Sequence, residues 1–294
     1  MNVLISIPAY NEEKTIGNLI SEIKKVMSNT KYKYNIQVID DGSKDRTSEA
    51  ANKEGALVFR HNYNRGLAEA FRTELKKFLE SNADILVHID ADSQYLPSDI
   101  PKLIKEIENG YDLVLGDRFS GKIEYMPLQK RLTNRAFSRA ISKIIRYKVN
   151  DCQTGFRAFT RQVAKEIPII SNHTYTQEQI IRAVRDNFKI KEVPVNFLKR
   201  KDGKSKLISN IFEYGIKAWI NIFRIYRDYE PLKFFGRIGA LFFTLGTIFG
   251  LYLLYIYFLT GKVSRLPLTI LTILLIITGV QIILFGFLAD MNRK

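Results

Sequence analysis

Two long apolar segments near the end of the chain limit its possible folds more than any other feature. Residues 238–259 and 266–289 are runs of 22 and 24 residues without a charged side chain. At about 1.5 Å of rise per residue, a helix of either length crosses the ~30 Å hydrocarbon core of a bilayer. Only a short connection separates the two runs, so the sequence predicts two transmembrane helices joined as a hairpin.

The net charge of +15 is concentrated in two segments. Residues 118–148 hold nine Lys or Arg and one acid, and residues 199–237 hold ten Lys or Arg and four acids. Basic segments attract nucleic acid, anionic lipid or phosphate-bearing substrates. Because the second segment leads into the apolar region and no nucleic-acid-binding motif is present, we expect a membrane surface and no nucleic acid. The Lys- and Arg-rich segment directly before the first apolar run also predicts that the bulk of the chain and both termini are cytoplasmic.

Three smaller features complete this outline. Gly246 and Gly250 form a small-xxx-small pair that can pack helices together, within the chain or in a homo-oligomer. Cys152 is the single cysteine, which excludes an intramolecular disulfide and fits a reducing compartment. The apolar start at residues 3–7 is short and has no basic leader, so we interpret it as a first strand and not as a signal peptide.

Strand and helix patterns alternate through the first two thirds of the chain. Apolar runs predict strands at residues 3–9, 35–39, 56–59, 85–89, 113–115 and 192–197, with a loop and short strand at 151–159. Helical spacing predicts helices at residues 12–27, 47–54, 66–79, 101–109, 128–147 and 178–186. This alternation is typical of a parallel sheet covered by helices on both faces. A further amphipathic stretch at 207–226 predicts a helix lying in the membrane interface.

Two carboxylates and an amide follow the predicted strand at 85–89, namely Asp90, Asp92 and Gln94. Ligands of a parallel sheet bind beyond the carboxyl ends of its strands. Oxygen ligands placed there can hold a hard divalent cation such as Mg²⁺ or Mn²⁺, and the cation can hold a diphosphate. The alternative is a strand that simply ends in turn-forming residues.

Polar residues also follow the first two predicted strands. Pro8, Tyr10 and Glu12 come after the first strand, where the turn at Pro8 offers a place for a base and a ribose. Asp40 and Asp41 come after the second strand, and Asp40 can accept hydrogen bonds from a base. Asp-Gly-Ser is also an ordinary turn sequence, so the chemistry alone leaves both interpretations open.

The order of these segments resembles a known enzyme family. Residues 8–13, 39–45, 64–66 and 90–94 together resemble glycosyltransferase family 2, and the resemblance extends over about residues 3–206. Residues 117–118, 130–134, 151–157 and 200–206 look like the polyprenyl-phosphate glycosyltransferases of that family, which include dolichyl-phosphate mannose synthase.

The resemblance implies an α/β architecture in three parts. Residues 1–206 would form a GT-A nucleotide-sugar-binding domain with a mostly parallel central sheet, residues 207–233 interfacial helices, and residues 234–294 the transmembrane hairpin. The implied reaction is metal-dependent, inverting transfer of one sugar, mannose from GDP-mannose in the first place, to dolichyl or polyprenyl phosphate. The alternatives are a UDP-sugar donor (glucose or N-acetylhexosamine) and an inactive, membrane-anchored nucleotide-sugar-binding protein.

The resemblance also assigns roles to residues. It implies nucleotide-sugar contacts from Pro8, Tyr10, Glu12, Asp40, Asp41, Arg65, Asp90 and Lys206, and Mg²⁺ or Mn²⁺ ligands in Asp90, Asp92 and Gln94. It implies acceptor-phosphate contacts from Arg118, Lys130, Arg131 and Asn134, and catalytic contributions from Asp92, Arg118, Arg131 and Arg200. The family has an Arg and a Ser around Lys130 and Asn134, so Lys130 and Arg131 remain alternatives as the phosphate ligand. An anionic acceptor needs no general base, and we expect His61 and His88 to be structural.

Overall fold

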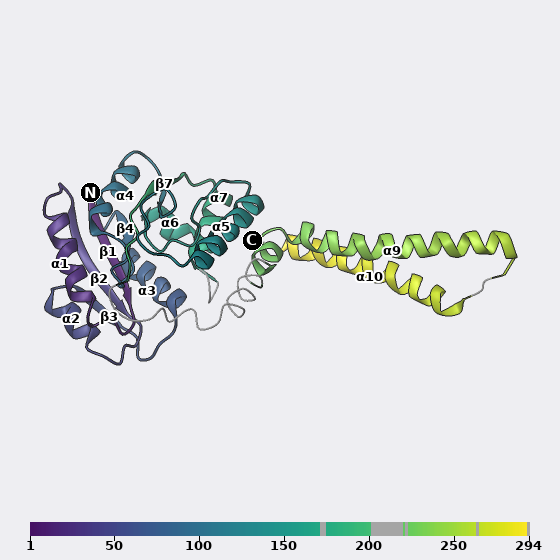
Figure 1. The fold of residues 1–294 in the computed structure, drawn as a ribbon, viewed down its shortest axis with the longest axis horizontal. Helices are drawn as coiled ribbons and strands as arrows, with labels where there is room; N and C mark the ends of the chain where they lie inside the picture. The colour runs from purple at the N-terminus through teal and green to yellow at the C-terminus, as the bar shows by residue number, and fades with distance from the viewer. Residues whose placement is uncertain (171–174, 201–219, 221–222, 263–264, 293–294) are drawn as a thin grey trace. The chain divides into compact units, whose positions relative to one another are not determined.

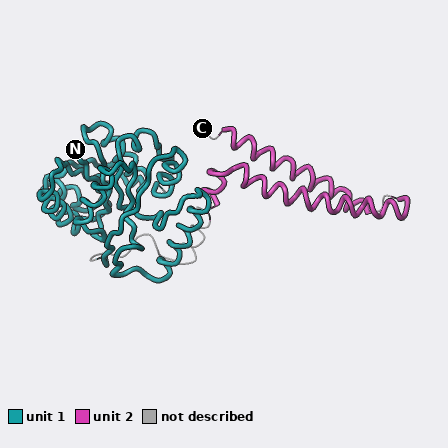
Figure 2. Tube along the Cα trace, turned by 90° about the horizontal axis from the view of Figure 1, so that it is seen from above, with its two compact units in different colours: residues 1–209 teal, residues 210–294 magenta. Residues whose placement is uncertain are grey.

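The computed structural model of the chain describes residues 1–170, 175–200, 220, 223–262 and 265–292. It divides into two compact units, Met1–Ser209 and Asn210–Lys294 (Figure 2). Lys206 and most of the predicted interfacial helix at 207–226 lie outside the described residues.

A seven-stranded sheet forms the centre of the first unit (Figure 1), with the strand order β3-β2-β1-β4-β6-β5-β7. The strands are Asn2–Ala9 (β1), Lys33–Asp40 (β2), Leu57–Arg60 (β3), Ile85–His88 (β4), Leu113–Asp117 (β5), Arg157–Thr160 (β6) and Ile190–Pro194 (β7). Strands β1 to β4 pair in parallel, as do β5 and β7, whereas β6 runs antiparallel between β4 and β5. The mostly parallel sheet expected from the sequence is confirmed, and the antiparallel β6 is an addition to it.

Helices cover both faces of this sheet, as predicted. They are Ile16–Met27 (α1), Thr47–Lys53 (α2), Leu67–Glu80 (α3), Ile100–Glu108 (α4), Leu128–Ile145 (α5), Arg161–Glu166 (α6) and Tyr175–Arg185 (α7), with a short 3-10 turn at Pro97–Asp99 (η1). The apolar sides of α1 and α4 share one core with alternate residues of β1, including Ile5 and Ile7. On the other face, Phe71 of α3 stacks on Tyr175 of α7 at 4.2 Å between ring centroids.

The start of α1 differs from its prediction by four residues. The helical spacing of apolar side chains begins near Glu12, but the helix begins at Ile16. The backbone N–H groups of Thr15 and Ile16 both donate to the carbonyl of Glu12, which closes a turn there. Residues 9–15 are therefore free of the helix and form the edge of the site described below.

Among its described residues, the second unit has two helices that are long and apolar enough to cross a membrane, Pro231–Thr260 (α9) and Leu266–Met291 (α10). Gly246 and Gly250 of α9 both face α10. A Cβ at Gly246 would lie 2.7 Å from Cγ1 of Ile276, and one at Gly250 would lie 3.5 Å from Cγ2 of Thr272. The glycine pair therefore packs the hairpin internally, and its assignment to a homo-oligomer gains no support.

A second set of glycines brings the two helix backbones closer still. A Cβ at Gly239 would lie 2.6 Å from the carbonyl oxygen of Gly279, and a Cβ at Gly279 would lie 2.6 Å from the backbone nitrogen of Phe243. These are distances that no side chain accommodates without moving a helix. Gly239 and Gly246 are seven residues apart on α9, as are Gly279 and Gly286 on α10, which is the heptad spacing that keeps one seam facing its partner.

Candidate functional site

A cavity of about 650 Å³ lies in the first unit, at the carboxyl ends of β1, β2 and β4. Its lining includes nine of the residues proposed from the sequence: Pro8, Tyr10, Glu12, Asp41, Asp90, Asp92, Gln94, Lys130 and Arg200. This is the edge at which parallel sheets bind ligands.

The turns after β1 and β2 hold each other in place. The backbone N–H of Asn11 donates to Oγ of Ser43 at 2.9 Å, and the N–H of Lys44 donates to Oδ1 of Asn11 at 2.8 Å. Asn11 has a positive φ of 54°, a conformation that Asn tolerates better than most residues. These bonds fix the turn that presents Tyr10 and Glu12 to the cavity.

The two carboxylates after β2 have different surroundings. Asp40 is fully buried, with Oδ1 accepting from the N–H of Ser43 at 2.8 Å and Oδ2 accepting from the hydroxyl of Ser48. It does not line the cavity, and its predicted contact with a base stays a prediction. Its place at the turn explains the Asp-Gly-Ser sequence, since it caps the backbone that follows.

Asp41 does line the cavity, and its carboxylate holds the loop that precedes α3. It accepts hydrogen bonds from the backbone N–H groups of Arg65 and Gly66 at 2.9 and 2.8 Å, and it contacts Nδ1 of His61 at 2.7 Å. The Arg65 side chain instead pairs with Glu69 at 2.8 Å. Arg65 thus contributes its backbone to this wall, and its side chain does not line the cavity.

Asp90 is held in a cradle at the end of β4. A Cβ at Gly155 would lie 2.5 Å from Oδ2 of Asp90, so only glycine lets the carboxylate lie against this stretch of backbone. On its other side, Oδ1 of Asp90 is 3.5 Å from Nε2 of His88. Gly155 lies within the segment 151–157 that resembles the family, but its contact with Asp90 has no signal in the sequence because it depends on the position of β6.

Both ring nitrogens of His88 have buried partners, Glu74 and Tyr175. Nδ1 of His88 is 2.8 Å from Oε2 of Glu74, and Nε2 is 2.9 Å from the hydroxyl of Tyr175. Burial by itself lowers the pKa of His88, but the carboxylates of Glu74 and Asp90 raise it to about 9. Burial favours a higher pKa for Asp90, but the bond and charge of His88 lower it overall. His88 is thus a structural partner of Asp90, as expected.

Asp92 and Gln94 complete this wall. Burial, followed by the nearby charge of Asp90, raises the pKa of Asp92 to about 6. The backbone N–H of Gln94 donates to Oδ1 of Asp92 at 3.2 Å, and the Gln94 amide donates to the carbonyl of Leu198 at 3.1 Å. Gln94 therefore ties the turn after β4 to the segment that follows β7.

Two cations, Arg200 and Lys130, line the same cavity as these carboxylates. Arg200 forms an ion pair with Glu12, and its Nη1 lies 3.9 Å from Oδ2 of Asp92. Lys130, from the first turns of α5, lines the cavity, and burial followed by the charge of Arg118 lowers its pKa. Arg131, the next residue, is exposed and does not line the cavity.

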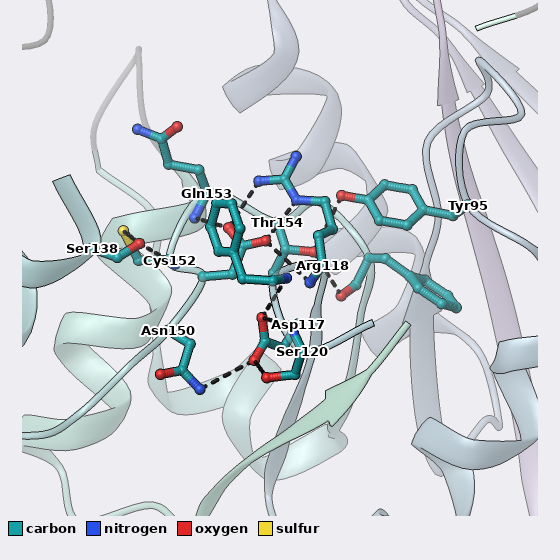
Figure 3. A network of polar contacts seen from close by, with 12 residues as sticks. Tyr95, Asp117, Arg118, Ser120, Ser138, Asn150, Cys152, Gln153 and Thr154 are labelled. Carbon is teal, nitrogen blue, oxygen red and sulfur yellow. Dashed lines mark hydrogen bonds and ion pairs between the residues drawn. The ribbon is translucent and has the colours of Figure 1, made fainter. Parts of the chain in front are cut away.

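Arg118 lies in a buried polar network and not on the cavity wall (Figure 3). Its Nε and Nη2 donate to the two carboxylate oxygens of Asp151 at 2.6 and 2.8 Å. Its guanidinium also lies 5.1 Å from the ring centroid of Phe197. In this structure the Arg118 charge is paired with Asp151, and its predicted contact with an acceptor phosphate stays a prediction. Asn134 is likewise buried, on the inner side of α5.

The donor set at Asp90 and Asp92 fits a cation that is shared with a substrate. Among the described residues, no group of three or more His, Cys, Asp or Glu side chains could hold a metal. Mg²⁺ in particular is commonly bound by one or two carboxylates plus substrate phosphates. The two carboxylates on one wall of an open cavity meet that requirement, and the Gly155 cradle leaves Asp90 no room to turn away.

The mostly parallel sheet, the cavity at its carboxyl edge and the paired carboxylates define an α/β protein that binds its ligand beyond the strand ends. Residues 4–168 match the family described as Glycosyl transferase family 2, and residues 230–291 match the GtrB C-terminal hairpin. The chain belongs to glycosyltransferase family 2, and it is a glycosyltransferase.

Three curated relatives extend this result. An uncharacterized protein of Methanocaldococcus jannaschii is 41% identical over 199 residues, which is 66% of this chain and 80% of that protein. A dolichol-phosphate mannosyltransferase of Pyrococcus furiosus is 33% identical over 73% of this chain and 62% of its own length. A UDP-N-acetylglucosamine–dolichyl-phosphate N-acetylglucosaminyltransferase of Methanococcus voltae is 33% identical over 66% and 84%.

A solved structure supports the fold. Glucosyl-3-phosphoglycerate synthase from Mycobacterium tuberculosis, in complex with Mn²⁺, UDP-glucose and phosphoglyceric acid, superposes with a TM-score of 0.56 at 22% identity. The match covers 74% of this chain and 76% of that one. The GT-A-like α/β fold expected from the sequence is therefore confirmed.

Proposed function

We propose that this enzyme transfers one hexose from a nucleotide sugar to the phosphate of dolichyl or another polyprenyl phosphate, with GDP-mannose as the first donor to test. The observation that carries the proposal is the presence of acidic and basic side chains in one cavity. Asp90 and Asp92 contribute carboxylates to its lining, and Lys130 and Arg200 contribute cations. The names of the Pyrococcus and Methanococcus relatives support a dolichyl-phosphate acceptor.

The donor occupies the side of the cavity next to β1 and β4 in this proposal. Pro8 and Tyr10 form the surface for the base and ribose, beside the wall that Asp41 organises. A Mg²⁺ or Mn²⁺ ion held by Asp90 and Asp92, when bound, neutralises the leaving diphosphate. Arg200 can exchange its pairing with Glu12 for contacts to the same diphosphate, because charge-assisted bonds to phosphate are strong.

We assign the acceptor phosphate to Lys130 and not to Arg131, because only Lys130 lines the cavity. A phosphate oxygen of the acceptor forms a bond to the anomeric carbon, while the bond from that carbon to the diphosphate oxygen breaks with inversion. The attacking group is already an anion, so no side chain has to remove a proton. This agrees with the engagement of His61 and His88 in buried contacts elsewhere.

We further propose that α9 and α10 span the membrane and that the first unit and both termini are cytoplasmic. The length and hydropathy of the two helices support the spans. The concentration of Lys and Arg in residues 199–237, directly before the first span, supports the orientation.

The test uses the purified full chain with dolichyl phosphate and a panel of labelled GDP-mannose, UDP-glucose and UDP-N-acetylglucosamine. We expect lipid-linked hexose phosphate from GDP-mannose, and its loss in the presence of a chelator. Asp92→Ala should abolish transfer, whereas Asp186→Ala, which removes an exposed carboxylate of the same fold, should not. Transfer from no donor would overturn the proposal, and full activity in chelator would overturn the role of the metal.

A UDP-sugar donor is the second candidate. The Methanococcus relative named for UDP-N-acetylglucosamine is as similar to this chain, at 33% identity, as the Pyrococcus relative named for mannose. The same panel separates the two, since the preferred donor is the one with the highest kcat/KM.

A further inference from the structure

The outer face of α5 carries four cations, of which Arg135 lies 5.1 Å from the ring centroid of Phe119. The helix contains no acidic residue, and Arg131, Arg135, Arg139 and Lys143 follow one another at four-residue spacing. Among the described residues, no carboxylate pairs with any of these four, although partly exposed or exposed cations on other helices, Lys77, Arg182 and Arg185, do have such partners. Like charges at this spacing destabilise a helix, so an external anion would relieve the repulsion.

Large apolar side chains lie among these cations. Leu128 and Leu132 are 69% and 58% exposed, and Tyr125, just before the helix, is 56% exposed. At 100° per residue, both leucines fall on the same side of the helix as the four cations. The opposite side is buried in the domain, through Asn134, Phe137, Ser138, Ile141 and Ile145. Basic and apolar residues mixed on one exposed face are typical of a helix that lies in a membrane interface.

The same helix begins at the cavity. Tyr125, Met126, Pro127 and Lys130 all contribute to the cavity wall. Lys130 therefore faces inward while its neighbour Arg131 belongs to the outer face, and one helix connects the cavity to the exposed basic surface.

We propose that the outer face of α5 docks onto anionic lipid headgroups, with Leu128 and Leu132 in the interfacial layer and the basic side chains at the level of the lipid phosphates. Docking in this way brings the mouth of the cavity to the depth at which a membrane lipid carries its phosphate. The benefit for catalysis rests on the proposed lipid acceptor, whereas the docking itself follows from the helix face. The exposed leucines favour a lipid surface over a nucleic acid, which offers no apolar layer.

The first experiment measures the depth of α5. Cys152 is buried, and burial raises the pKa of its thiol to about 12, so it does not compete for a thiol-reactive dye. An environment-sensitive dye is attached to Leu132→Cys in the full chain, reconstituted in nanodiscs of phosphatidylcholine with or without about one-third phosphatidylglycerol. We expect a blue shift and quenching by brominated lipid in the anionic discs. The control dye is placed at Lys25→Cys on α1, at the other end of the first unit in Figure 1.

The second experiment reverses charge away from the cavity. Arg139→Glu combined with Lys143→Glu should remove the blue shift at position 132 and raise the KM for polyprenyl phosphate in anionic discs by about five-fold or more, at unchanged KM for the nucleotide sugar. The matched control is Lys25→Glu combined with Lys53→Glu, which reverses two exposed lysines on α1 and α2. The control should leave both readouts unchanged.

The outcomes separate docking from function. A dye at position 132 that reports water in both kinds of disc overturns the docking proposal, even where transfer to polyprenyl phosphate is normal. A blue shift that depends on anionic lipid and on Arg139 and Lys143 supports docking, even where no tested donor is used. A blue shift equal in neutral discs overturns the electrostatic part of the proposal.

Discussion

At the scale of single residues, the position of Asp90 depends on a glycine far away in the sequence. Gly155 provides the surface against which the carboxylate lies, and His88 contacts the other oxygen. The side chain is thereby held at two points before any ligand arrives. Such support of a metal ligand by its neighbours commonly matters nearly as much as the ligand itself.

Gly155→Ala should weaken binding of Mn²⁺ in the presence of nucleotide by about ten-fold, because the new methyl group displaces the Asp90 carboxylate. Titration calorimetry or the electron resonance of bound Mn²⁺ measures this directly. Gly116→Ala is the matched control, since its Cβ would press on Phe156 and Val195 at 3.0–3.2 Å without touching a cavity carboxylate. Equal Mn²⁺ affinity in wild type and Gly155→Ala would contradict the role of Gly155 in positioning the Asp90 carboxylate.

The buried pair of Arg118 and Asp151 leads to a second prediction. Arg118→Leu leaves the Asp151 carboxylate buried without its partner, so we expect a loss of about 3–5 kcal/mol of unfolding free energy. Replacing both residues by leucine should restore part of it, because no unpaired charge remains. Denaturant unfolding of the purified chain checks this. A variant with normal stability but a raised KM for the acceptor would instead return Arg118 to the acceptor site.

At the scale of helices and strands, some features follow from local pattern and others do not. Asp90 and Asp92 could be assigned to the site because an apolar run ended directly before them. Lys130 and Arg131 could not be distinguished, since neighbours on a helix point about 100° apart and the sequence does not show which of them faces inward. The partnership of Arg118 with Asp151 depends on tertiary packing that no local pattern encodes.

The antiparallel direction of β6 is another feature that local sequence pattern could not predict. Alternation of strands and helices predicts a parallel sheet, and the short strand at residues 157–160 carries no signal of its direction. Its insertion between β4 and β5 brings Gly155 against Asp90 from just before the start of a strand, whereas Asp90 itself follows the end of one.

The hairpin yields a prediction at this scale. Gly279→Leu should force α9 and α10 apart, because a Cβ there would already lie 2.6 Å from the backbone of Phe243. We expect the distance between spin labels on the two helices to increase by ~1–2 Å, given normal interaxial distances of 8–10 Å. Gly236→Leu is the control, since nothing lies within 4 Å of its Cβ position. An unchanged label distance in Gly279→Leu would contradict the packing described above.

At the scale of the whole molecule, the chain divides into a unit that contains the cavity and a unit that contains the hairpin. All described cavity residues belong to the first unit. Chemistry and anchoring are thus assigned to separate parts of one chain, and the second part can act on the rate by concentrating the first part near its acceptor.

A chain that ends at Ser209 should therefore fold and bind nucleotide with the affinity of the full chain. Its turnover on polyprenyl phosphate in membranes should fall by about 100-fold, because the confinement at the bilayer is lost. Turnover on a short, water-soluble isoprenyl phosphate should change little. Parallel assays of the two acceptors measure the difference, and equal rates of both proteins on the membrane acceptor would give the hairpin a different role.

The close glycine contacts of α9 and α10 have a consequence for protein engineering. Since the two helices pack closely against each other, we expect the hairpin to form without the rest of this chain and without a second copy. It should therefore behave as a transplantable module. Fused behind a soluble reporter, residues 231–291 should deliver that reporter to the membrane fraction as a monomer, and the Gly279→Leu version should do so with increased aggregation.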